Sequence, residues 1–331
     1  DDLMDADELD LYGTMPKVAD VDRDGLNDGE EVSLKTNPAL MDTDGDGISD
    51  GVEVNVLHTN PLAQDSDGDG INDGDEDSDS DGLPNSDELN KHGTAPIVAD
   101  TDQDSLSDGD EVNILGTNPS TADTDGDGVL DGNEDADKDG LTNFDELYIH
   151  KTDPLDADTD NDSLLDGSEV QLNTDPKIAD TDKDGVPDGD EDTDSDGLTD
   201  SDELKKYTTN PLVADTDGDH LSDGIEQLLL HTDPLKKDSN GNGFLDGDED
   251  ADSDGLANLV ELNTYKTDPT KADTDNDGLD DSQEVHLKTD PLVEDTDGDK
   301  LIDGDEINIY KTDPLLDDSD QDGLSDSDEL N

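Results

Sequence analysis

Aspartate and glutamate recur through this chain at fixed spacing. The pattern D-x-D-x-D-G-[LIV]-x-D-G-x-E runs, with small variations, from Asp20 to Glu329 and forms sixteen complete loops. Carboxylates at alternate positions, followed by a glycine turn and a final glutamate, can gather many oxygen atoms around one point. Such a set of oxygens suits a hard cation, and it contains no nucleophile or proton-transfer pair of the kind that enzymes use.

The spacing matches the D-x-[DN]-x-[DN]-G-x5-E loop of EF-hand proteins. In that loop positions 1, 3 and 5 supply side-chain oxygens, position 7 a backbone carbonyl, position 9 often a bridging water, and position 12 a bidentate glutamate. Position 12 is glutamate in all sixteen loops, and positions 1, 3 and 5 are aspartate except at Asn240 and Asn242. Hard oxygens in a six- to eightfold shell favour calcium over magnesium. We therefore expect about one calcium ion per loop, about sixteen in all.

The candidate ligands are grouped here by loop position. Position 1 is Asp20, Asp42, Asp65, Asp77, Asp100, Asp123, Asp135, Asp158, Asp180, Asp192, Asp215, Asp238, Asp250, Asp273, Asp295 and Asp318. Position 3 is Asp22, Asp44, Asp67, Asp79, Asp102, Asp125, Asp137, Asp160, Asp182, Asp194, Asp217, Asn240, Asp252, Asp275, Asp297 and Asp320. Position 5 is Asp24, Asp46, Asp69, Asp81, Asp104, Asp127, Asp139, Asp162, Asp184, Asp196, Asp219, Asn242, Asp254, Asp277, Asp299 and Asp322.

The remaining ligands lie in the second half of each loop. Position 7, through its carbonyl, is Leu26, Ile48, Ile71, Leu83, Leu106, Val129, Leu141, Leu164, Val186, Leu198, Leu221, Phe244, Leu256, Leu279, Leu301 and Leu324. Position 9, directly or through water, is Asp28, Asp50, Asp73, Asn85, Asp108, Asp131, Asn143, Asp166, Asp188, Asp200, Asp223, Asp246, Asn258, Asp281, Asp303 and Asp326. Position 12 is Glu31, Glu53, Glu76, Glu88, Glu111, Glu134, Glu146, Glu169, Glu191, Glu203, Glu226, Glu249, Glu261, Glu284, Glu306 and Glu329.

Position 7 is apolar in every loop, so its side chain can face a small core while its carbonyl faces the ion. Position 13 is also apolar in eleven of the twelve loops that are not fused to a following loop, with Gln227 as the exception. A disordered acidic tail would explain the charge, but it would not place apolar residues at fixed offsets from carboxylates.

The loops follow one another with a regular register. Most starts are 22 or 23 residues apart, but four steps are only 12, at Glu76-Asp77, Glu134-Asp135, Glu191-Asp192 and Glu249-Asp250. We call the first loop of each fused pair a leading loop; the four leading loops are 65–76, 123–134, 180–191 and 238–249. Residues 1–19 are a partial repeat and connector, and residues 20–331 carry the loops in blocks 42–99, 100–157, 158–214 and 215–272 and a partial block 273–317. Each block should touch mainly its neighbours.

Short elements must position these ligands. A helix should start near the end of each loop and continue through the glutamate, until a proline such as Pro38 or Pro314 stops it. One or two helical turns are too short to persist without tertiary support. The expected fold class is a calcium-stabilised repeat array with little regular secondary structure, short helical turns after EF-hand-like loops, and the shape of an elongated rod.

The composition excludes several classes of protein. The 331 residues contain 101 Asp plus Glu against 17 Lys plus Arg, a formal charge of -84, so nucleic acid is an unsuitable partner. Hydrophobic residues are 27% and aromatics 2%, a range in which a chain without a bound partner tends to be disordered. Cysteine is absent, and no run approaches the roughly 18 apolar residues of a membrane span.

Two deviations from the pattern predict unequal loops. Position 6 normally needs positive φ, yet Ser105, Ser163, His220 and Lys300 occupy it in four loops, at a cost of about 1 kcal/mol each. In the loop from Asp238, Asn240 and Asn242 replace two carboxylates, so this site should bind calcium less tightly and empty early as calcium falls.

One stretch carries a family resemblance. Asp42-Thr43-Asp44-Gly45-Asp46-Gly47-Ile48-Ser49-Asp50-Gly51-Val52-Glu53-Val54, followed by Thr59-Asn60-Pro61, resembles the bacterial thrombospondin type 3 repeat, and the resemblance extends over nearly the whole chain. It implies a calcium-wrapped, helix-poor rod of secreted and surface proteins that often serves as a spacer or stalk. The animal relatives carry disulfides that this chain lacks, so calcium and the small apolar stripe would have to provide rigidity.

The expected function is that of an extracellular or cell-surface calcium-binding structural protein, not an enzyme. It would form a rigid stalk, an adhesin spacer or the protomer of a surface fibre, with calcium and further copies of the chain as partners. Two alternatives stay open: a calcium reservoir or mineral-nucleating acidic matrix protein, and a tether for an enzyme or lectin domain outside this segment.

Overall fold

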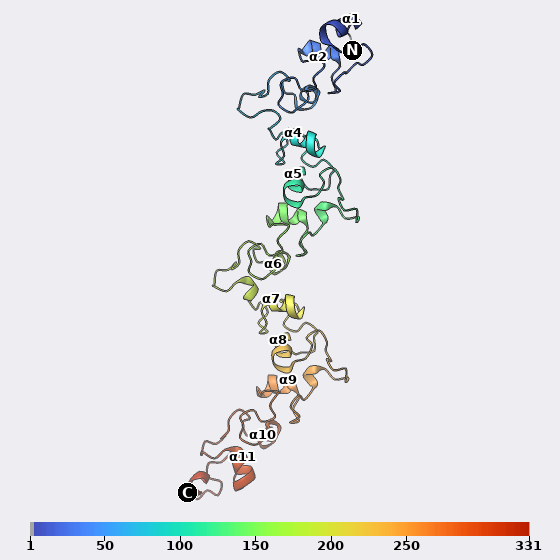
Figure 1. Cartoon of the computed structure of the whole chain (residues 1–331). Helices are drawn as coiled ribbons and strands as arrows, with labels where there is room; N and C mark the ends of the chain where they lie inside the picture. The colour runs from blue at the N-terminus through green and yellow to red at the C-terminus, as the bar shows by residue number, and fades with distance from the viewer. Residues whose placement is uncertain (1–2, 331) are drawn as a thin grey trace. The chain divides into compact units, whose positions relative to one another are not determined.

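The computed structural model describes residues 3–330 and divides the chain into two compact units. Unit 1 comprises Asp1–Thr159 and Leu165–Gln171, and unit 2 comprises Asp160–Leu164 and Leu172–Asn331. Within each unit short helical turns alternate with irregular loops, and residues 3–330 form no β-strand (Figure 1). The prediction of a repeat array with little regular secondary structure is therefore confirmed.

Every helical element is short. The α-helical turns are α1 (Asp5–Asp7), α2 (Asp28–Leu34), α3 (Asp50–Val52), α4 (Asn85–Asp87), α5 (Asp108–Asp110), α6 (Asp166–Leu172), α7 (Asp200–Asp202), α8 (Asp223–Ile225), α9 (Asn258–Val260), α10 (Asp281–Leu287), α11 (Asp303–Asp305) and α12 (Asp326–Glu329). Wider π-type turns follow at η1 (Glu8–Tyr12), η2 (Glu53–Leu57), η3 (Glu88–His92), η4 (Glu111–Leu115), η6 (Asp145–His150), η8 (Glu203–Tyr207), η9 (Glu226–Leu230), η11 (Glu261–Tyr265) and η12 (Glu306–Tyr310). Tight 3-10 turns are η5 (Asp131–Asn133), η7 (Asp188–Asp190) and η10 (Asp246–Asp248). None of the helices in residues 3–330 is long and apolar enough to cross a membrane.

The helical turns begin at position 9 because position 8 is extended and often caps them. Ser49, Ser107 and Ser222 each accept a hydrogen bond from the backbone N–H three residues later, at 3.4, 3.1 and 3.3 Å. A hydroxyl at this place satisfies a free donor of the first turn. The capped turn then carries position 12 toward positions 3 and 5 of its own loop, as Glu53 lies near Asp44 and Asp46.

The helical turns end earlier than the sequence predicted. His58, Gly93 and Lys311 adopt left-handed conformations with φ of 62, 74 and 67°. The N–H of Gly93 donates to the carbonyl of Glu88 at 2.6 Å and closes the last turn. Each of these residues lies three positions before the proline, so the left-handed residue ends the helix and the proline only follows.

Position 7 forms the core in most loops. Leu26, Ile48, Leu83, Leu106, Leu141, Leu164, Leu198, Leu221 and Leu279 are all buried. Close packing from the following loop covers this position. A Cβ added to Gly132, in the loop after Leu106, would lie 3.4 Å from Leu106 Cγ.

The prediction of a buried position 7 is wrong for the four leading loops and for the last loop. The exposed fractions of these residues are 48% for Ile71, 41% for Val129, 38% for Val186, 64% for Phe244 and 53% for Leu324. In a fused pair the second loop starts directly after the first, and its position 10 does not cover position 7 of the leading loop. Ser86, position 10 of the loop from Asp77, lies instead near Gly74 and Gly47: its Cβ would be 3.5 and 3.4 Å from a Cβ built on these glycines. The leading loops are therefore left uncovered on this side.

The expectation of positive φ at position 6 is confirmed. Ser105, Ser163, His220 and Lys300 have φ of 87, 85, 85 and 89°. A residue with a Cβ pays strain of about 1 kcal/mol or more in this region, where the other loops have glycine. The loop geometry is thus kept in these four loops in spite of the residue.

Position 10 brings consecutive loops into contact. The N–H groups of Gly51, Gly109 and Gly132 donate to Oδ2 of the position-5 aspartate in the preceding loop, at 2.8, 3.1 and 3.2 Å. A Cβ on Gly109 would lie 2.0 Å from the carbonyl oxygen of Asp81, which is far inside contact distance. At these three junctions glycine allows the close approach of two backbones and is not required for an unusual φ. Ser282 and Ser327 make the same contact with Asp254 and Asp299, at 2.9 and 2.8 Å.

Replacing Gly109 with alanine should therefore loosen the junction between the loops that begin at Asp77 and Asp100. Overpacking of this kind costs about 1–3 kcal/mol, and in a repeat array the cost should stay local. Hydrogen exchange at saturating calcium should show faster exchange at Leu106–Glu111 in the variant. Ser282→Ala is the matched control, because position 10 of that loop already carries a Cβ. Unchanged exchange in Gly109→Ala would contradict the contact.

Candidate metal centres

The first half of each loop gathers three carboxylates. Asp42, Asp44 and Asp46 each offer an oxygen, and these atoms lie within 4.8 Å of one another; so do those of Asp20, Asp22 and Asp24, and of Asp65, Asp67 and Asp69. Backbone donors hold the carboxylates in place. The N–H groups of Gly45 and Gly47 donate to Asp42 at 2.7 and 3.1 Å, and that of Ile48 donates to Asp46 Oδ1 at 2.8 Å. Positions 1, 3 and 5 therefore meet as the sequence predicted.

A second group joins consecutive loops. Asp24 and Glu31 of one loop lie within 4.8 Å of Asp50, position 9 of the next loop. Asp46, Glu53 and Asp73 form the corresponding group one repeat later. The sequence assigned position 9 to its own loop, whereas the structure brings it to positions 5 and 12 of the preceding loop. A cation at such a group would bind two loops to each other.

Hydroxyl groups that the sequence analysis missed orient these carboxylates. The backbone N–H and hydroxyl of Thr43 donate to the two oxygens of Asp50 at 2.8 and 2.6 Å, and Asn37 N–H donates to Thr43 Oγ1 at 3.0 Å. The hydroxyl of Thr59, six residues after Glu53, donates to Glu53 Oε1 at 3.2 Å. The recurring threonine or serine at position 2 and the recurring threonine before Asn-Pro or Asp-Pro are the signals that could have identified them.

The position-12 glutamates are the clearest indication that a cation belongs here. Glu53, Glu88 and Glu111 are completely buried, and Oε2 of each has no hydrogen-bond partner. Asp44 Oδ2 and Asp46 Oδ2 are likewise buried without a partner beside Glu53. Burying unpaired carboxylates is strongly unfavourable unless a cation neutralises them. The donor set consists of oxygens alone, which fits the calcium that the sequence predicted.

The carboxylates repel one another when no cation is bound. Burial, followed by the charges of Asp44 and Asp46, raises the pKa of Glu53 to about 8. Burial, followed by the charges of Asp104 and Asp102, raises the pKa of Glu111 to about 8. The pKa of Asp46 rises to about 6, mainly through burial. Protons and cations therefore compete for the same oxygens.

Calcium binding should weaken as the pH falls from about 8 toward 4.5, because the ion must displace protons from glutamates whose pKa is raised to about 8. The stability of the calcium-free fold should depend on pH in the opposite direction. A raised carboxyl pKa means that the fold holds more protons than the unfolded chain, so its stability falls as pH rises through this window. Titration calorimetry in buffers of different ionisation enthalpy at pH 7 should register proton release on calcium binding. Buffer-independent heats would contradict the prediction.

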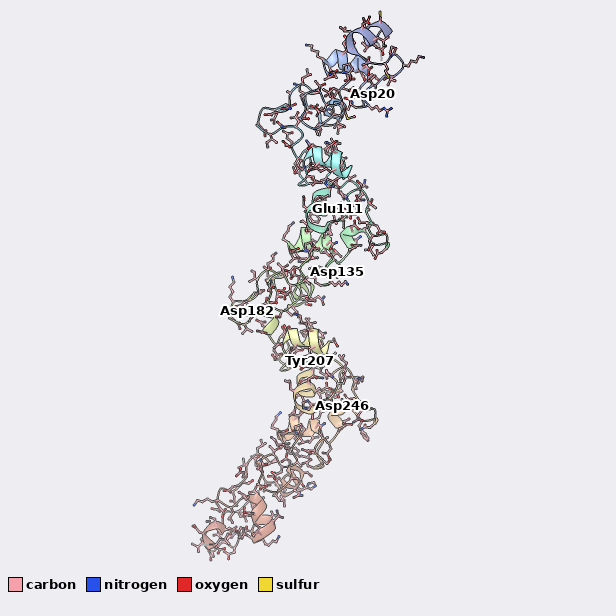
Figure 2. All side chains as sticks on the ribbon, in the orientation of Figure 1. Asp20, Glu111, Asp135, Asp182, Tyr207 and Asp246 are labelled. Atoms are coloured by element: carbon pink, nitrogen blue, oxygen red, sulfur yellow. The ribbon has the colours of Figure 1, made fainter. Side chains whose placement is uncertain are left out.

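The leading loops present their carboxylates differently. Asp67 and Asp69 are exposed, as are Asp182 and Asp184, whereas the corresponding residues of the other loops before the last one are at least partly buried. Figure 2 shows Asp182 on a loop that extends sideways from its neighbours, and Glu111 among packed elements. The leading loops still contribute position 9 to the preceding loop, as Asp73 does beside Glu53.

The second loop of three fused pairs has asparagine at position 9. Asn85, Asn143 and Asn258 are buried, and Nδ2 of each donates to the position-9 carbonyl of the leading loop at 2.8 Å. Their Oδ1 atoms accept from backbone N–H groups at 3.1, 3.2 and 3.1 Å. These side chains thus bridge two loops, and their predicted role as calcium ligands stays a prediction.

Comparison with known proteins gives a family match along the chain and local matches to solved structures. No curated protein sequence matches. Among solved structures, the B domain of a biofilm-associated protein is 39% identical over 14% of this chain and 11% of that chain, with a TM-score of 0.14. The BSP domain of a biofilm-associated protein is 52% identical over 13% of this chain and 8% of that chain, with a TM-score of 0.13. This chain therefore spans only a small part of either structure.

The bacterial TSP3 repeat matches this chain in tandem. The matched residues are 20–39, 42–64, 77–99, 100–122, 135–157, 158–177, 192–214, 215–237, 250–272, 273–294, 295–316 and 318–331. The matches skip all four leading loops, whose position 7 and position 3 side chains lie exposed. The leading loops thus lie between the matched repeats. With its loop register, its glutamates and its threonines in the arrangement described, this chain belongs to the family of bacterial TSP3 repeats.

Proposed function

We propose that this chain is an extracellular calcium-binding structural protein, in which calcium ions hold consecutive loops together and stiffen the array into a stalk or adhesin spacer. The observation that carries the proposal is the group formed by Asp46, Glu53 and Asp73, whose oxygens come from two loops and lie within 4.8 Å. A cation at that point links the loops directly, and equivalent position-5 to position-10 contacts recur along the chain.

The chemistry of the ligands favours a calcium-rich location. The chain has a formal charge of -84, and only calcium in the range of about 10⁻⁴–10⁻³ M, as for extracellular modules, would fill loops of this type. Secretion or surface display follows from that affinity.

Electron microscopy and small-angle scattering at millimolar calcium test this function. A stiff, monodisperse rod whose length follows the number of repeats is the expected result. The reservoir alternative predicts that calcium uptake continues beyond the ligand groups and that solid calcium salt forms on the protein. A chain that binds calcium in its loops but stays flexible would exclude the rigid stalk and favour the alternative of a tether for another domain.

A further inference from the structure

The leading loop 238–249 has amides where fifteen other loops have carboxylates. Asn240 and Asn242 occupy positions 3 and 5, and each is followed by glycine. These are the only two Asn-Gly steps in the sequence. Residues 240–244 are exposed, and a Cβ at either Gly241 or Gly243 would meet nothing within 4 Å. The two steps are therefore open to solvent and uncrowded.

The hydrogen bonds of this loop settle which way the two amides face. Asn240 Oδ1 accepts from Asn242 N–H at 3.0 Å, and Asn242 Oδ1 accepts from Phe244 N–H at 2.8 Å. The Nδ2 groups are thereby turned to the loop interior, where both donate to Oε1 of Glu249, that of Asn240 at 2.7 Å. Both amides of this loop are therefore hydrogen-bonded to its own position-12 glutamate.

The aspartate loops show what the amides replace. Asp46 Oδ1 accepts from Ile48 N–H at 2.8 Å, in the same way as Asn242, and its Oδ2 is a buried oxygen without a hydrogen-bond partner. An amide Nδ2 at the same place is a donor and cannot ligate a cation. In loop 238–249 the position-12 glutamate is satisfied by two donors, whereas Glu53 keeps a free Oε2.

We propose that Asn240 and Asn242 are deamidation sites, and that their conversion to aspartate turns this hydrogen-bonded loop into a calcium-binding loop. The gain of a calcium site rests on the proposed function of the other loops. The conversion adds two carboxylates, removes the two donors to Glu249 and restores the aspartates that the other loops have at positions 3 and 5. Loop 238–249 would thus be a latent calcium site, which forms when the two asparagines deamidate during long exposure to a calcium-poor or alkaline medium.

The chemistry uses water alone as co-reactant. The backbone nitrogen of Gly241 or Gly243 attacks Cγ of the preceding asparagine, a C–N bond forms, and Nδ2 leaves as ammonia with the proton of the glycine nitrogen. Water then opens the cyclic imide. Cleavage between Cγ and the glycine nitrogen yields aspartate, and cleavage of the main-chain carbonyl bond yields an isoaspartyl link, whose extra backbone atom would spoil the loop.

The folded loop restrains the reaction. Gly241 N–H and Gly243 N–H donate to Asp238 at 2.7 and 2.8 Å, so each nitrogen must leave this carboxylate before it attacks. Asp246 of the same loop is buried, and the N–H of the following residue, Gly247, donates a hydrogen bond to Asp219 of the preceding loop. Calcium bound by the preceding loop would therefore hold loop 238–249 closed, and chelation should speed deamidation.

The test combines mass spectrometric peptide mapping with ion counting by native mass spectrometry on the whole chain. After incubation at mildly alkaline pH, conversion should appear at Asn240 and Asn242, faster with chelator than with calcium. Asn240→Asp/Asn242→Asp should bind one calcium ion more than the fresh chain. Asn240→Gln/Asn242→Gln, whose longer side chains cyclise far more slowly, should stay unconverted and keep the ion count of the fresh chain.

Asp182→Asn/Asp184→Asn in the leading loop 180–191 is the matched control, and it should lose one ion. Two results would overturn the inference: no conversion at the two asparagines, or an equal ion count for the fresh chain and the double aspartate variant. If no loop of any variant binds calcium, the proposed function fails and the latent site with it, while peptide mapping still decides whether the asparagines deamidate.

Discussion

Removal of calcium should expand the chain and abolish its short helical turns. The formal charge is -84, and fully buried position-12 glutamates lie close to other carboxylates. Glu111, for example, is close to Asp102 and Asp104 and accepts a hydrogen bond from the Thr117 hydroxyl at 3.1 Å. The apolar core of residues 3–330 consists of nine buried leucine and isoleucine side chains for sixteen loops, which cannot offset that repulsion and the conformational entropy of the chain. We therefore expect the free energy of cation binding to supply the free energy of folding.

Small-angle scattering with and without chelator measures the expansion, and circular dichroism follows the helical turns. Added sodium chloride separates two causes, because salt screens repulsion between exposed charges but does not replace a ligated ion. In salt the chelated chain should contract without regaining its helical signal. Added calcium should restore both the compact size and the helical signal. An unchanged radius of gyration after chelation would contradict the central assignment.

Replacing a buried position-12 glutamate such as Glu111 should weaken calcium binding in two loops. Replacing the position-12 glutamate of a leading loop should weaken it in one loop only. Glu111 is fully buried, and Asp104 of its loop accepts from Gly132 N–H of the next loop at 3.2 Å. The charge of Asp131, position 9 of that next loop, also acts on Asp104. Glu134, in contrast, is half-buried at the end of a leading loop, whose neighbour offers the amide of Asn143 instead of a carboxylate.

Glu111→Gln should raise the calcium midpoint of the loops 100–111 and 123–134 at least tenfold, which corresponds to about 1.4 kcal/mol. Glu134→Gln, the matched control, should affect residues 123–134 alone. Hydrogen exchange across a calcium titration resolves the individual loops. Equal effects of the two substitutions on both loops would show that the carboxylate groups between loops do not bind calcium.

The chemistry of the loops could be predicted from the sequence because it is local. Asp42 and Asp46 are positioned by backbone donors within five residues, so the spacing alone brings positions 1, 3 and 5 together. The same holds for the left-handed residue at position 6, where Lys300 keeps the φ that glycine adopts elsewhere. The register, the fused pairs and the family resemblance are likewise properties of linear spacing.

The tertiary structure decided which loop each carboxylate serves and which loops are covered. Asp50 faces Asp24 and Glu31, 26 and 19 residues earlier, and Phe244 is exposed although its residue type predicts burial. Both results depend on how one loop packs against another, which the residue types at positions 7 and 9 do not specify. The sequence predicts the inside of each loop better than the contacts between loops for a physical reason. Hydrogen bonds within a loop are set by neighbouring residues, whereas contacts between loops are set by the length of the connector that joins them.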